Sequence, residues 1–571
     1  MPTKEEDEQF YRDTERIAFP KIDDRQLAML EPLGKRRLVR RGEYVIKAGE
    51  RDLGLVVVLS GQLEVFEHRD GEELILATPG PRDFTGDISM LAGTAALGST
   101  RGLAEESEIL ELGARELRAA LAELPGLGDP IVKALMMRRK RLLRDRDFAG
   151  FRVIASEGSR EGHELHDFLQ KNHVPHRLIT VQEPDGQRMA ERFNLSERNL
   201  PTLITPAGIP LRRPSIREVA QEAGLMRHLV ENNETEIHCD VAIVGAGPAG
   251  LSAAVNAASE GLKTIVLEGY APGGQAGSSS LIENFFGFPT GISGGDLTHR
   301  AQLQAMRFGA RFSTPSHALS LNFRDGDEYG SEMLLEGCGA TLRAKCVIIA
   351  TGADYLRLEA EGREKFEGMG VYYAATALEA QLCRNSTVIV VGGANSAGQA
   401  AMYLSETAAK VLLVIRGDGL SSTMSSYLSR RVETKSNIEI HRCTVIRRMM
   451  GEKRLEAVEL ENTVTGEKQT VQTPAVFSMI GAKPCTHWLP AEIVRDAKGF
   501  ILTGAAVANA AAWQGHNRAP GALETSRPGV FAAGDARSGS VKRCAAAVGE
   551  GGMAVAGVHQ ALAALRNGHQ P

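Results

Sequence analysis

The sequence predicts a chain of several domains: a β-rich N-terminal unit with helices, a small α/β unit, and a large α/β unit at the C-terminus. Three observations predict this architecture. The 571 residues suffice for roughly four domains. Short apolar runs separated by turns fill the first part of the chain. Two glycine-rich turns, each between a predicted strand and a predicted helix, occur in the last part.

The composition is that of an ordinary globular protein whose charges nearly balance. Hydrophobic residues make up 43% of the chain, and 66 Lys and Arg stand against 71 Asp and Glu, for a net charge of −5. This balance argues against nucleic acid or an anionic membrane as the main partner. The acidic N-terminus lacks the apolar stretch of a signal peptide, and no run reaches the roughly 18 apolar residues of a membrane-spanning helix. We therefore expect a cytoplasmic protein with no membrane partner.

The cysteines exclude two kinds of site. The chain has seven, all after residue 238, and no two are spaced C-x-x-C. This spacing excludes a dithiol redox motif and a zinc site of closely spaced cysteines, so we expect no metal. The odd, sparse count also argues against a secreted disulfide scaffold. The seven are Cys239, Cys338, Cys346, Cys383, Cys443, Cys485 and Cys544.

Residues 36–112 are expected to form a small β-barrel or jelly roll, because short apolar runs alternate with Gly and Asp turns. Helical segments over Arg115–Asp147 follow, with expected breaks at Pro125-Gly126 and Asp129-Pro130. A basic cluster at 133–146 is interpreted as the solvated face of a helix. No helix-turn-helix pattern follows, which disfavours a DNA-binding regulator. The cluster contains Lys133, Arg138, Arg139, Lys140, Arg141, Arg144 and Arg146.

Residues 151 to about 226 have the pattern of a small α/β unit. A strand at Phe151–Ala155 precedes a helix, and a second strand at His176–Val181 precedes another helix. The polar stretch Arg227–Glu236 is expected to be a linker to the C-terminal unit.

The first glycine-rich turn has the context of a dinucleotide-binding fingerprint. Gly245-x-Gly247-x-x-Gly250 follows a predicted strand and opens a predicted helix, and Glu268 comes 23 residues after the first glycine. Gly245 allows the tight turn, and Gly247 lets backbone N–H groups approach a pyrophosphate at the helix N-terminus. Gly250 lets the helix pack closely on the strand, and Glu268 is expected to bind ribose hydroxyls.

A second such unit begins at the predicted strand Thr387–Val391, and its turn is poorer. Gly392 and Gly393 are present, but Ala394 takes the place of the glycine that approaches the phosphates. Arg416 follows the next predicted strand, where a guanidinium suits the 2′-phosphate of NADP. A solvated charge at a strand end is an equal alternative for Arg416.

A short apolar strand near the C-terminus ends in Gly534-Asp535. A carboxylate at that place can accept a hydrogen bond from a ribityl hydroxyl, although taken alone the pair is also common turn chemistry.

Together these motifs resemble the low-molecular-weight thioredoxin reductases and their flavoprotein relatives. The resemblance implies an FAD domain at 237–356 and 486–571, interrupted by an NAD(P)H domain at 357–485, and a homodimer. The stretches that carry it are Ile243–Gly250, Pro272–Gln275, Ile282–Pro289, Ala350–Ala353 and Val530–Asp535. The residues it places along FAD are Gly245, Gly247, Pro248, Ala249, Gly250, Glu268, Gly274, Gln275, Asn284, Thr351, Gly352, Gly534, Asp535, Lys542, Arg543 and Cys544. Those it places along NAD(P)H are Gly392, Gly393, Asn395, Ser396 and Arg416.

The redox sulfur of that family is missing. The family's Cys-Ala-Thr-Cys segment corresponds to Ala374–Ala377, in which both cysteine positions are alanine. A thiolate is needed to take electrons from reduced flavin and attack a disulfide, and alanine does neither. No side chain is therefore expected to be catalytic. Cys544, which the resemblance puts beside the flavin, is either a single redox thiol or, as we favour, a small buried residue.

The other two units carry resemblances of their own. The middle unit resembles a thioredoxin-like fold with a cis proline at Pro201, but its first loop has no cysteine, so it is expected to be redox-inert. The N-terminal unit resembles the cyclic-nucleotide-binding β-roll of catabolite-activator-type proteins. This resemblance makes Gly86 and Asp87 possible contacts of a nucleotide. It puts Leu97 at the position of the phosphate-binding arginine and Gly98 at that of its Ser/Thr neighbour, and Arg101 substitutes only if the loop is remodelled.

Three functions follow from these features. The favoured one is an FAD-dependent NAD(P)H oxidoreductase that passes electrons from reduced flavin directly to a soluble acceptor, such as a quinone, oxygen or ferredoxin, with NADH or NADPH as donor. The N-terminal unit would then be a sensor that controls rotation between the two nucleotide domains. The alternatives are a flavin-containing sensor or scaffold with little turnover and, disfavoured by Ala374 and Ala377, a thioredoxin-disulfide reductase.

Overall fold

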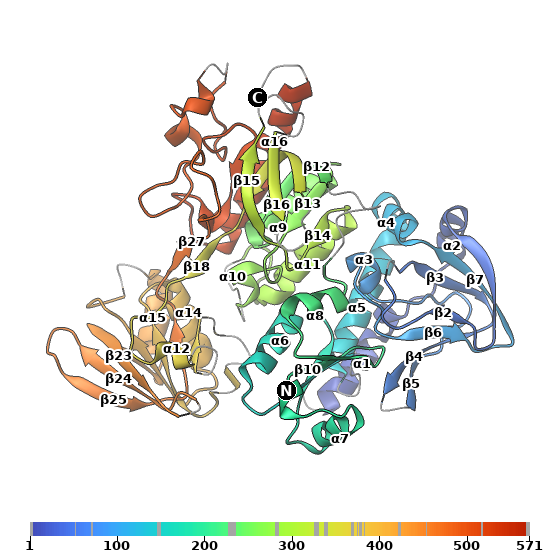
Figure 1. The fold of residues 1–571 in the computed structure, drawn as a ribbon, viewed down its shortest axis with the longest axis horizontal. Helices are drawn as coiled ribbons and strands as arrows, with labels where there is room; N and C mark the ends of the chain where they lie inside the picture. Colours follow the sequence, from blue (N-terminus) through green and yellow to red (C-terminus); the bar gives the residue numbers. More distant parts are fainter. Residues whose placement is uncertain are drawn as a thin grey trace.

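The computed structural model contains four packed units. It describes residues 4–566 except 52, 70–71, 146–149, 227–235, 280–281, 283–284, 325–329, 336–340, 367–369, 374, 376–379, 382, 421–423, 453 and 515–517. In Figure 1 the N-terminal unit (4–145) lies on the right and the middle unit (150–226) below the centre. The large-sheet unit (236–355 and 482–566) is above them, and the inserted unit (356–481) is at the lower left. The expected linker, apart from Glu236, lies outside the described residues.

The N-terminal unit is a pair of antiparallel sheets with helices at both ends. Its elements are α1 (Lys4–Ala18), α2 (Asp24–Leu30), β1 (Lys35–Arg40), β2 (Tyr44–Ile46), β3 (Leu55–Ser60), β4 (Leu63–Arg69), β5 (Glu72–Ala77), α3 (Ser89–Ala92), β6 (Ser99–Gly102), β7 (Glu106–Leu112), α4 (Ala114–Glu123) and α5 (Pro125–Arg144). The sheets have the orders β1-β7-β3 and β2-β6-β4-β5, which confirms the β-rich prediction. The expected break at Asp129-Pro130 is wrong. Helix α5 continues through Pro130, because a proline near the start of a 20-residue helix removes only one backbone donor.

The middle unit is a four-stranded sheet flanked by helices. Its elements are β8 (Phe151–Ala155), α6 (Arg160–Lys171), β9 (His176–Thr180), α7 (Pro184–Arg192), β10 (Thr202–Ile204), β11 (Pro210–Arg212) and α8 (Ile216–Glu222). The strand order is β11-β10-β8-β9, with β8 and β9 parallel and the other pairs antiparallel. The Leu200–Pro201 peptide bond is cis. A capping box between Ser215 and Glu218 fixes the start of α8.

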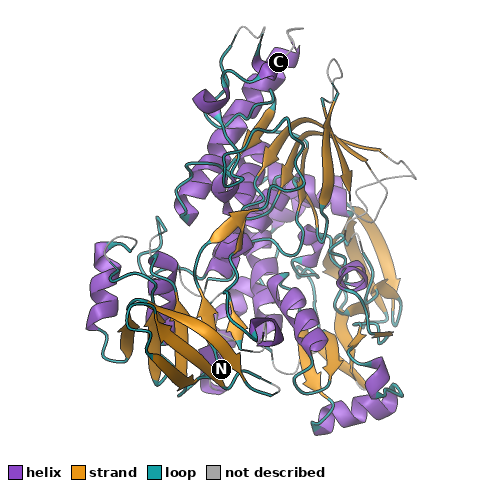
Figure 2. Ribbon diagram, turned by 60° about the vertical axis from the view of Figure 1, so that its left-hand side comes forward, coloured by secondary structure: helices purple, strands orange, loops and turns teal. Residues whose placement is uncertain are grey.

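The large-sheet unit is built on a parallel sheet extended by an antiparallel meander. Its main elements are β12 (Glu236–Val244), α9 (Pro248–Ser259), β13 (Thr264–Leu267), α10 (Gly274–Gly277), α11 (Gly294–Arg307), β14 (Arg311–Ser313), β15 (Ala318–Phe323), β16 (Ser331–Leu335), β17 (Thr341–Ile349), β28 (Val530–Ala532) and α16 (Cys544–Arg566). The order is β14-β13-β12-β17-β16-β15, and β28 pairs with β17. Strands β13, β12, β17 and β28 run parallel. Helices lie along this sheet in Figure 2.

The inserted unit has its own parallel sheet. Its main elements are α12 (Arg363–Phe366), β19 (Val371–Tyr372), β20 (Thr387–Val391), α14 (Asn395–Leu404), β21 (Lys410–Val414), α15 (Ser426–Thr434), β22 (Ile438–His441), β23 (Thr444–Met450), β24 (Ala457–Asn462), β25 (Lys468–Gln472) and β26 (Val476–Ser478). The sheet order is β19-β26-β20-β21-β22, and β23–β25 form a separate antiparallel sheet. Strands β18 (Ala353–Tyr355) and β27 (Ala482–Pro484) pair where the chain enters and leaves this unit. The two dinucleotide-binding-type folds of the prediction are thus present.

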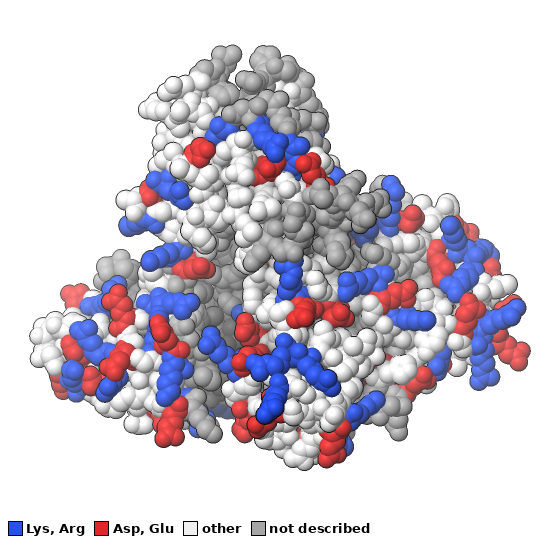
Figure 3. Space-filling view, in the orientation of Figure 1, with Lys and Arg blue, Asp and Glu red and all other residues white. Residues whose placement is uncertain are grey.

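Charged side chains of both signs are interspersed over the face of the molecule shown in Figure 3. That face carries no extended surface of one sign, which agrees with the nearly balanced composition. Among the described helices, none is long and apolar enough to cross a membrane.

Candidate active site

The glycine turn between β12 and α9 is shaped by close backbone packing. Gly245 has φ +103°, and a side chain there would collide with the Ala350 carbonyl at the end of β17. A side chain at Gly250 would collide with the Gly245 carbonyl. Gly247 caps α9 and is open in front, since a Cβ on it would lie 3.9 Å from the Cα of Gly274. Two glycine backbones therefore face each other at a helix N-terminus, which is the cradle that a pyrophosphate requires.

Glu268 closes this turn from the end of β13. Its Oε2 accepts a hydrogen bond from the Ala246 N–H at 2.8 Å, and its Oε1 accepts one from the Tyr270 N–H at 3.0 Å. Burial raises the pKa of Glu268, although these backbone donors oppose the rise. Each carboxylate oxygen keeps a lone pair for a ribose hydroxyl, so the residue fits the role expected of it.

The parallel register brings the remaining predicted FAD residues to the same sheet edge. Thr351 and Gly352 follow β17, and Gly534 and Asp535 follow β28. The Thr351 hydroxyl donates to the Cys485 carbonyl at 2.8 Å, which ties this edge to the segment that returns from the inserted unit. Burial raises the pKa of Asp535, while nearby Lys542 lowers it.

The start of α16 lies against this edge. Lys542 Nζ donates to the Asp535 carbonyl at 2.6 Å, and Arg543 precedes the helix as an exposed residue. The helix begins at Cys544. Burial, aided by the Asp535 charge, raises the pKa of Cys544 to about 11, so the thiol is protonated at neutral pH. On the opposite side, Gln275 Nε2 donates to the Ala353 carbonyl.

One predicted FAD residue cannot be placed, and one supporting residue was missed. Asn284 lies outside the described residues. Glu550 on α16 accepts a hydrogen bond from the Gly534 N–H at 2.7 Å and pairs with Arg537 at 2.5 Å. Glu550 stabilises the turn at Gly534, which lies 16 residues earlier in the chain. In the sequence it stands out only as a glutamate between glycines.

The second glycine turn occupies the equivalent place in the inserted unit. Gly392 has φ +140°, and a side chain there would collide with the Met479 carbonyl. The exposed Ala394 caps α14, next to Gly393. Asn395 Oδ1 accepts a hydrogen bond from the Ser425 N–H at 2.7 Å, so its side chain holds a neighbouring loop. Ser396 is exposed in the first turn of α14, and Arg416 is exposed just after the carboxyl end of β21.

The positions that replace the family's cysteines, Ala374 and Ala377, lie outside the described residues. Ala375 between them is buried in the core of the inserted unit. The six described cysteines form no disulfide bond, and the described residues contain no group of three or more metal-ligating side chains.

The expectation of a solvated basic helix is wrong for two of its residues. Arg138 and Arg139 on α5 are only 9% and 6% exposed. Arg138 donates to the carbonyls of Ala18, Phe84 and Gly86 at 2.7 to 2.9 Å. Arg139 pairs with Asp87 at 2.6 Å. Buried arginines persist here because each guanidinium is matched by acceptors from distant segments.

The possible nucleotide contacts of the N-terminal unit are therefore engaged within the chain. Asp87 is paired with Arg139, and Gly86, at φ +101°, packs against Met90. Arg101 is held by Glu64 and Glu73, both at 2.6 Å. Leu97 is buried, and the carbonyl of Phe66 lies over Gly98.

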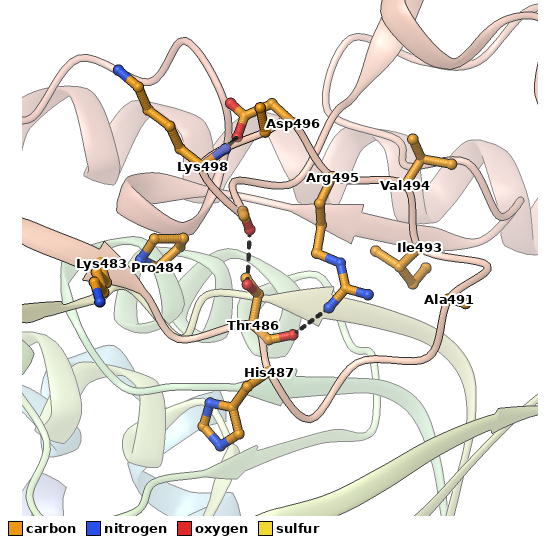
Figure 4. A pocket seen from close by; sticks show the side chains of 12 residues that line it. Lys483, Pro484, Thr486, His487, Ala491, Ile493, Val494, Arg495, Asp496 and Lys498 are labelled. Atoms are coloured by element: carbon orange, nitrogen blue, oxygen red, sulfur yellow. Dashed lines mark hydrogen bonds between the residues drawn. The ribbon is translucent and has the colours of Figure 1, made fainter.

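A pocket of about 680 Å³ is formed by β27 and the segment that follows it, and none of the predicted site residues lines it (Figure 4). Arg495 donates to the Thr486 carbonyl and the Thr486 hydroxyl donates to the Gly499 carbonyl, both at 2.8 Å. These two hydrogen bonds stabilise the conformation of the segment that follows β27.

Comparison with known proteins gives two family matches. Residues 239–551 match the family described as pyridine nucleotide-disulphide oxidoreductase. Residues 36–123 match the cyclic nucleotide-binding domain. The chain is 32% identical over 332 residues to the thioredoxin reductase of Treponema pallidum, covering 58% of this chain and 100% of that protein. It is 31% identical over 316 residues to that of Listeria innocua, covering 55% and 91%.

Solved structures agree with these matches. The thioredoxin reductase of Lactococcus lactis, in its FR conformation, superposes with a TM-score of 0.50 at 27% identity, covering 57% of this chain and 99% of that one. The thioredoxin reductase of T. acidophilum gives a TM-score of 0.50 at 28% identity over the same shares. The similarity covers the large-sheet and inserted units together and leaves out most of the first 230 residues.

Proposed function

The chain belongs to the pyridine nucleotide-disulphide oxidoreductase family, and we propose that its reduced flavin passes electrons directly to a soluble acceptor rather than through a protein dithiol. The coarser activity follows from the family: the protein is an FAD-dependent oxidoreductase that uses NAD(P)H and carries a cyclic nucleotide-binding domain. We further propose that 237–356 with 486–571 bind FAD and that 357–485 bind NAD(P)H.

The observation that carries the proposal is a cradle for FAD in a chain whose two redox cysteine positions are alanine. Gly247, Gly274 and Glu268 form a cradle whose geometry fits FAD. FAD bound there would supply hydride acceptance and electron transfer. This chain's residues would hold its phosphates at the α9 N-terminus and its ribose at Glu268. Ala374 and Ala377 offer no thiolate.

Cys544 does not replace the missing pair. A thiol whose pKa is about 11 is ionised in about one molecule in ten thousand at pH 7, and the thiolate is the reactive form. A single cysteine also cannot close an intramolecular disulfide. Electrons are therefore expected to leave the flavin without a covalent sulfur intermediate.

Anaerobic stopped-flow reduction of the FAD-loaded protein tests the proposal. We expect NADPH or NADH to bleach the flavin, and a quinone, oxygen or a ferredoxin to reoxidise it, while oxidised thioredoxin does not. A robust thioredoxin-reduction rate would contradict the proposal. The variant A374C/A377C is the matched gain-of-function control, because it restores the family's two sulfur positions and should acquire disulfide reduction.

A sensor or scaffold with little turnover is the second candidate. The observation that favours it is the second glycine turn, where Ala394 stands at the phosphate approach and Asn395 is bound to Ser425. Steady-state turnover separates the two functions. Substantial turnover with a quinone, oxygen or a ferredoxin would exclude the sensor function. If neither NADH nor NADPH reduces the flavin, the oxidoreductase function is excluded.

A further inference from the structure

Arg139 makes a buried ion pair inside the N-terminal unit and a hydrogen bond to the middle unit. Its Nε lies 2.6 Å from Asp87 Oδ2, and its Nη2 donates to the Ser89 hydroxyl at 2.7 Å. Its third nitrogen, Nη1, donates to the carbonyl of His173 in the middle unit at 3.0 Å. All three guanidinium nitrogens are thus used, two on the turn 86–89 and one across the boundary between units.

The middle unit also covers the loop that follows this turn. Ala95 N–H donates to the Ala223 carbonyl at 3.3 Å, directly after α8. Gly224 has φ +72°, and a Cβ on it would lie 2.7 Å from the Ala95 nitrogen. Leu97 belongs to the same hydrophobic cluster as Phe151 and the rest of the middle unit's core. The loop 94–97 is therefore packed as an interface.

Helix α11 of the large-sheet unit completes the junction. The rings of His173 and His299 stack with centroids 3.9 Å apart and planes 26° apart. Farther along α11, Arg307 pairs with Asp129 of α5 at 2.8 Å and donates to the Leu121 carbonyl at 3.2 Å. At its N-terminal end α11 packs on α10, which contains Gly274 of the FAD cradle. A side chain at Gly294 would collide there with the Ala276 carbonyl.

We propose that Arg139 and the loop 94–97 form an intramolecular docking surface, which the middle unit of the same chain occupies. The turn 86–89 holds Arg139 in this surface through Asp87 and Ser89. The resemblance to cyclic nucleotide-binding domains assigns Gly86 and Asp87 to a ligand, and Asp87 is the ion-pair partner of Arg139 at this surface. Leu97, at the position of the phosphate-binding arginine, is part of it too. A cyclic nucleotide and the docked middle unit therefore compete for the same segment.

Two glycine variants test this docking in the full-length, FAD-loaded protein. Gly224→Val places a side chain against the Ala95 backbone, whereas Gly208→Val changes another positive-φ glycine of the middle unit with nothing within 4 Å. The backbone strain is similar, so the difference reports the interface. Hydrogen exchange followed by mass spectrometry should be at least tenfold faster over 83–97 and 294–307 in G224V, and unchanged there in G208V. Equal exchange in the two variants would overturn the proposal.

Arg139→Met provides a second, independent break. Removing one partner of a buried ion pair leaves the other uncompensated, so we expect an increase in exchange of about 100-fold over 86–97 and 173–176. Arg144→Met is the matched control, because Arg144 lies on the same helix and pairs with Asp7 inside the N-terminal unit at 2.6 Å. An R139M protein that exchanges like R144M would also overturn the proposal.

Calorimetric titration with cAMP and cGMP tests the competition. We expect cAMP or cGMP to bind G224V at least tenfold more tightly than the wild type, and any binding to the wild type to accelerate exchange over 216–224. No binding to either protein would contradict the competition. Binding that appears only in G224V supports competition as well. Micromolar binding to the wild type with exchange of the middle unit unchanged, and with the same affinity in G224V, would show that the surface is an open ligand site. None of these readouts uses turnover, so they are independent of the proposed electron transfer.

Discussion

Replacing Glu268 with glutamine should weaken FAD binding by a predictable amount. The carboxylate accepts two backbone hydrogen bonds that hold the glycine turn, at 2.8 and 3.0 Å, and it is expected to accept the ribose hydroxyls as well. The glutamine side chain has one acceptor oxygen and one NH₂ group. One of the two backbone N–H groups would therefore face the NH₂ donor, and its hydrogen bond to a charged acceptor would be lost. A hydrogen bond to a charged group is worth about 1.5–3 kcal/mol. A loss of about 2 kcal/mol corresponds to about a 30-fold rise in Kd.

Fluorescence titration of the apoprotein with FAD measures this change. Glu332→Gln is the control, since Glu332 on β16 pairs with Arg324 at 2.6 Å, away from the carboxyl edge of the sheet. Because burial raises the pKa of Glu268, the wild-type Kd should begin to rise, on acidification, at a higher pH than an exposed glutamate would give. That pH dependence should be absent in E268Q. An E268Q protein that binds FAD within threefold of the wild type, or an E332Q protein that is equally weakened, refutes the role of this carboxylate.

Three further outcomes follow from the same geometry. Arg416→Ala should raise the KM for NADPH about tenfold and leave that for NADH unchanged if this exposed strand-end guanidinium meets the 2′-phosphate; equal effects on both coenzymes would make it a solvated charge. Cys544→Ser should change the rate of flavin reoxidation by less than twofold, because the thiol is protonated at neutral pH; a larger loss in stopped-flow traces would assign it a redox role. Burial lowers the pKa of His173 to about 4, below its ordinary 6.5, so the unfolded chain binds more protons between those values. The contribution of His173 to the free energy of unfolding should therefore be complete above pH 6.5 and fall by about 3 kcal/mol toward pH 4. In His173→Asn, chosen because asparagine tolerates the positive φ of this position, stability should fall less steeply with decreasing pH. An unchanged pH dependence in thermal melts would contradict this assignment.

Some elements were predictable to the residue because their signals are local. Strands β8 and β20 have the predicted ends, since each is a short run rich in apolar residues and bounded by polar or glycine residues. The glycine turns were recognisable for the same reason: their positions depend on backbone contacts that only glycine permits, as the collision at Gly245 shows.

Arg138 and Arg139 could not be predicted, because their burial depends on acceptors far away in the sequence. The sequence around them is a helical run of basic residues, which is typical of a solvated face. The carbonyls of Ala18 and Phe84 and the carboxylate of Asp87 reach them only in the folded chain. Glu550 is a similar case, since its partner Gly534 lies at the end of another element.

The chemistry of sulfur in this chain is constrained by burial as well as by sequence. Burial raises the pKa of Cys485 to about 12 and that of Cys544 to about 11, and it raises those of Cys239 and Cys346 further. Cys239 and Cys346 lie on neighbouring strands inside the sheet and contribute to its core. Each of these four thiols is thus protonated at neutral pH and is a poor nucleophile. None of these four cysteines supplies a thiolate to the sheet edge where FAD is expected to bind. This protonation supports the proposed direct transfer from flavin to an external acceptor.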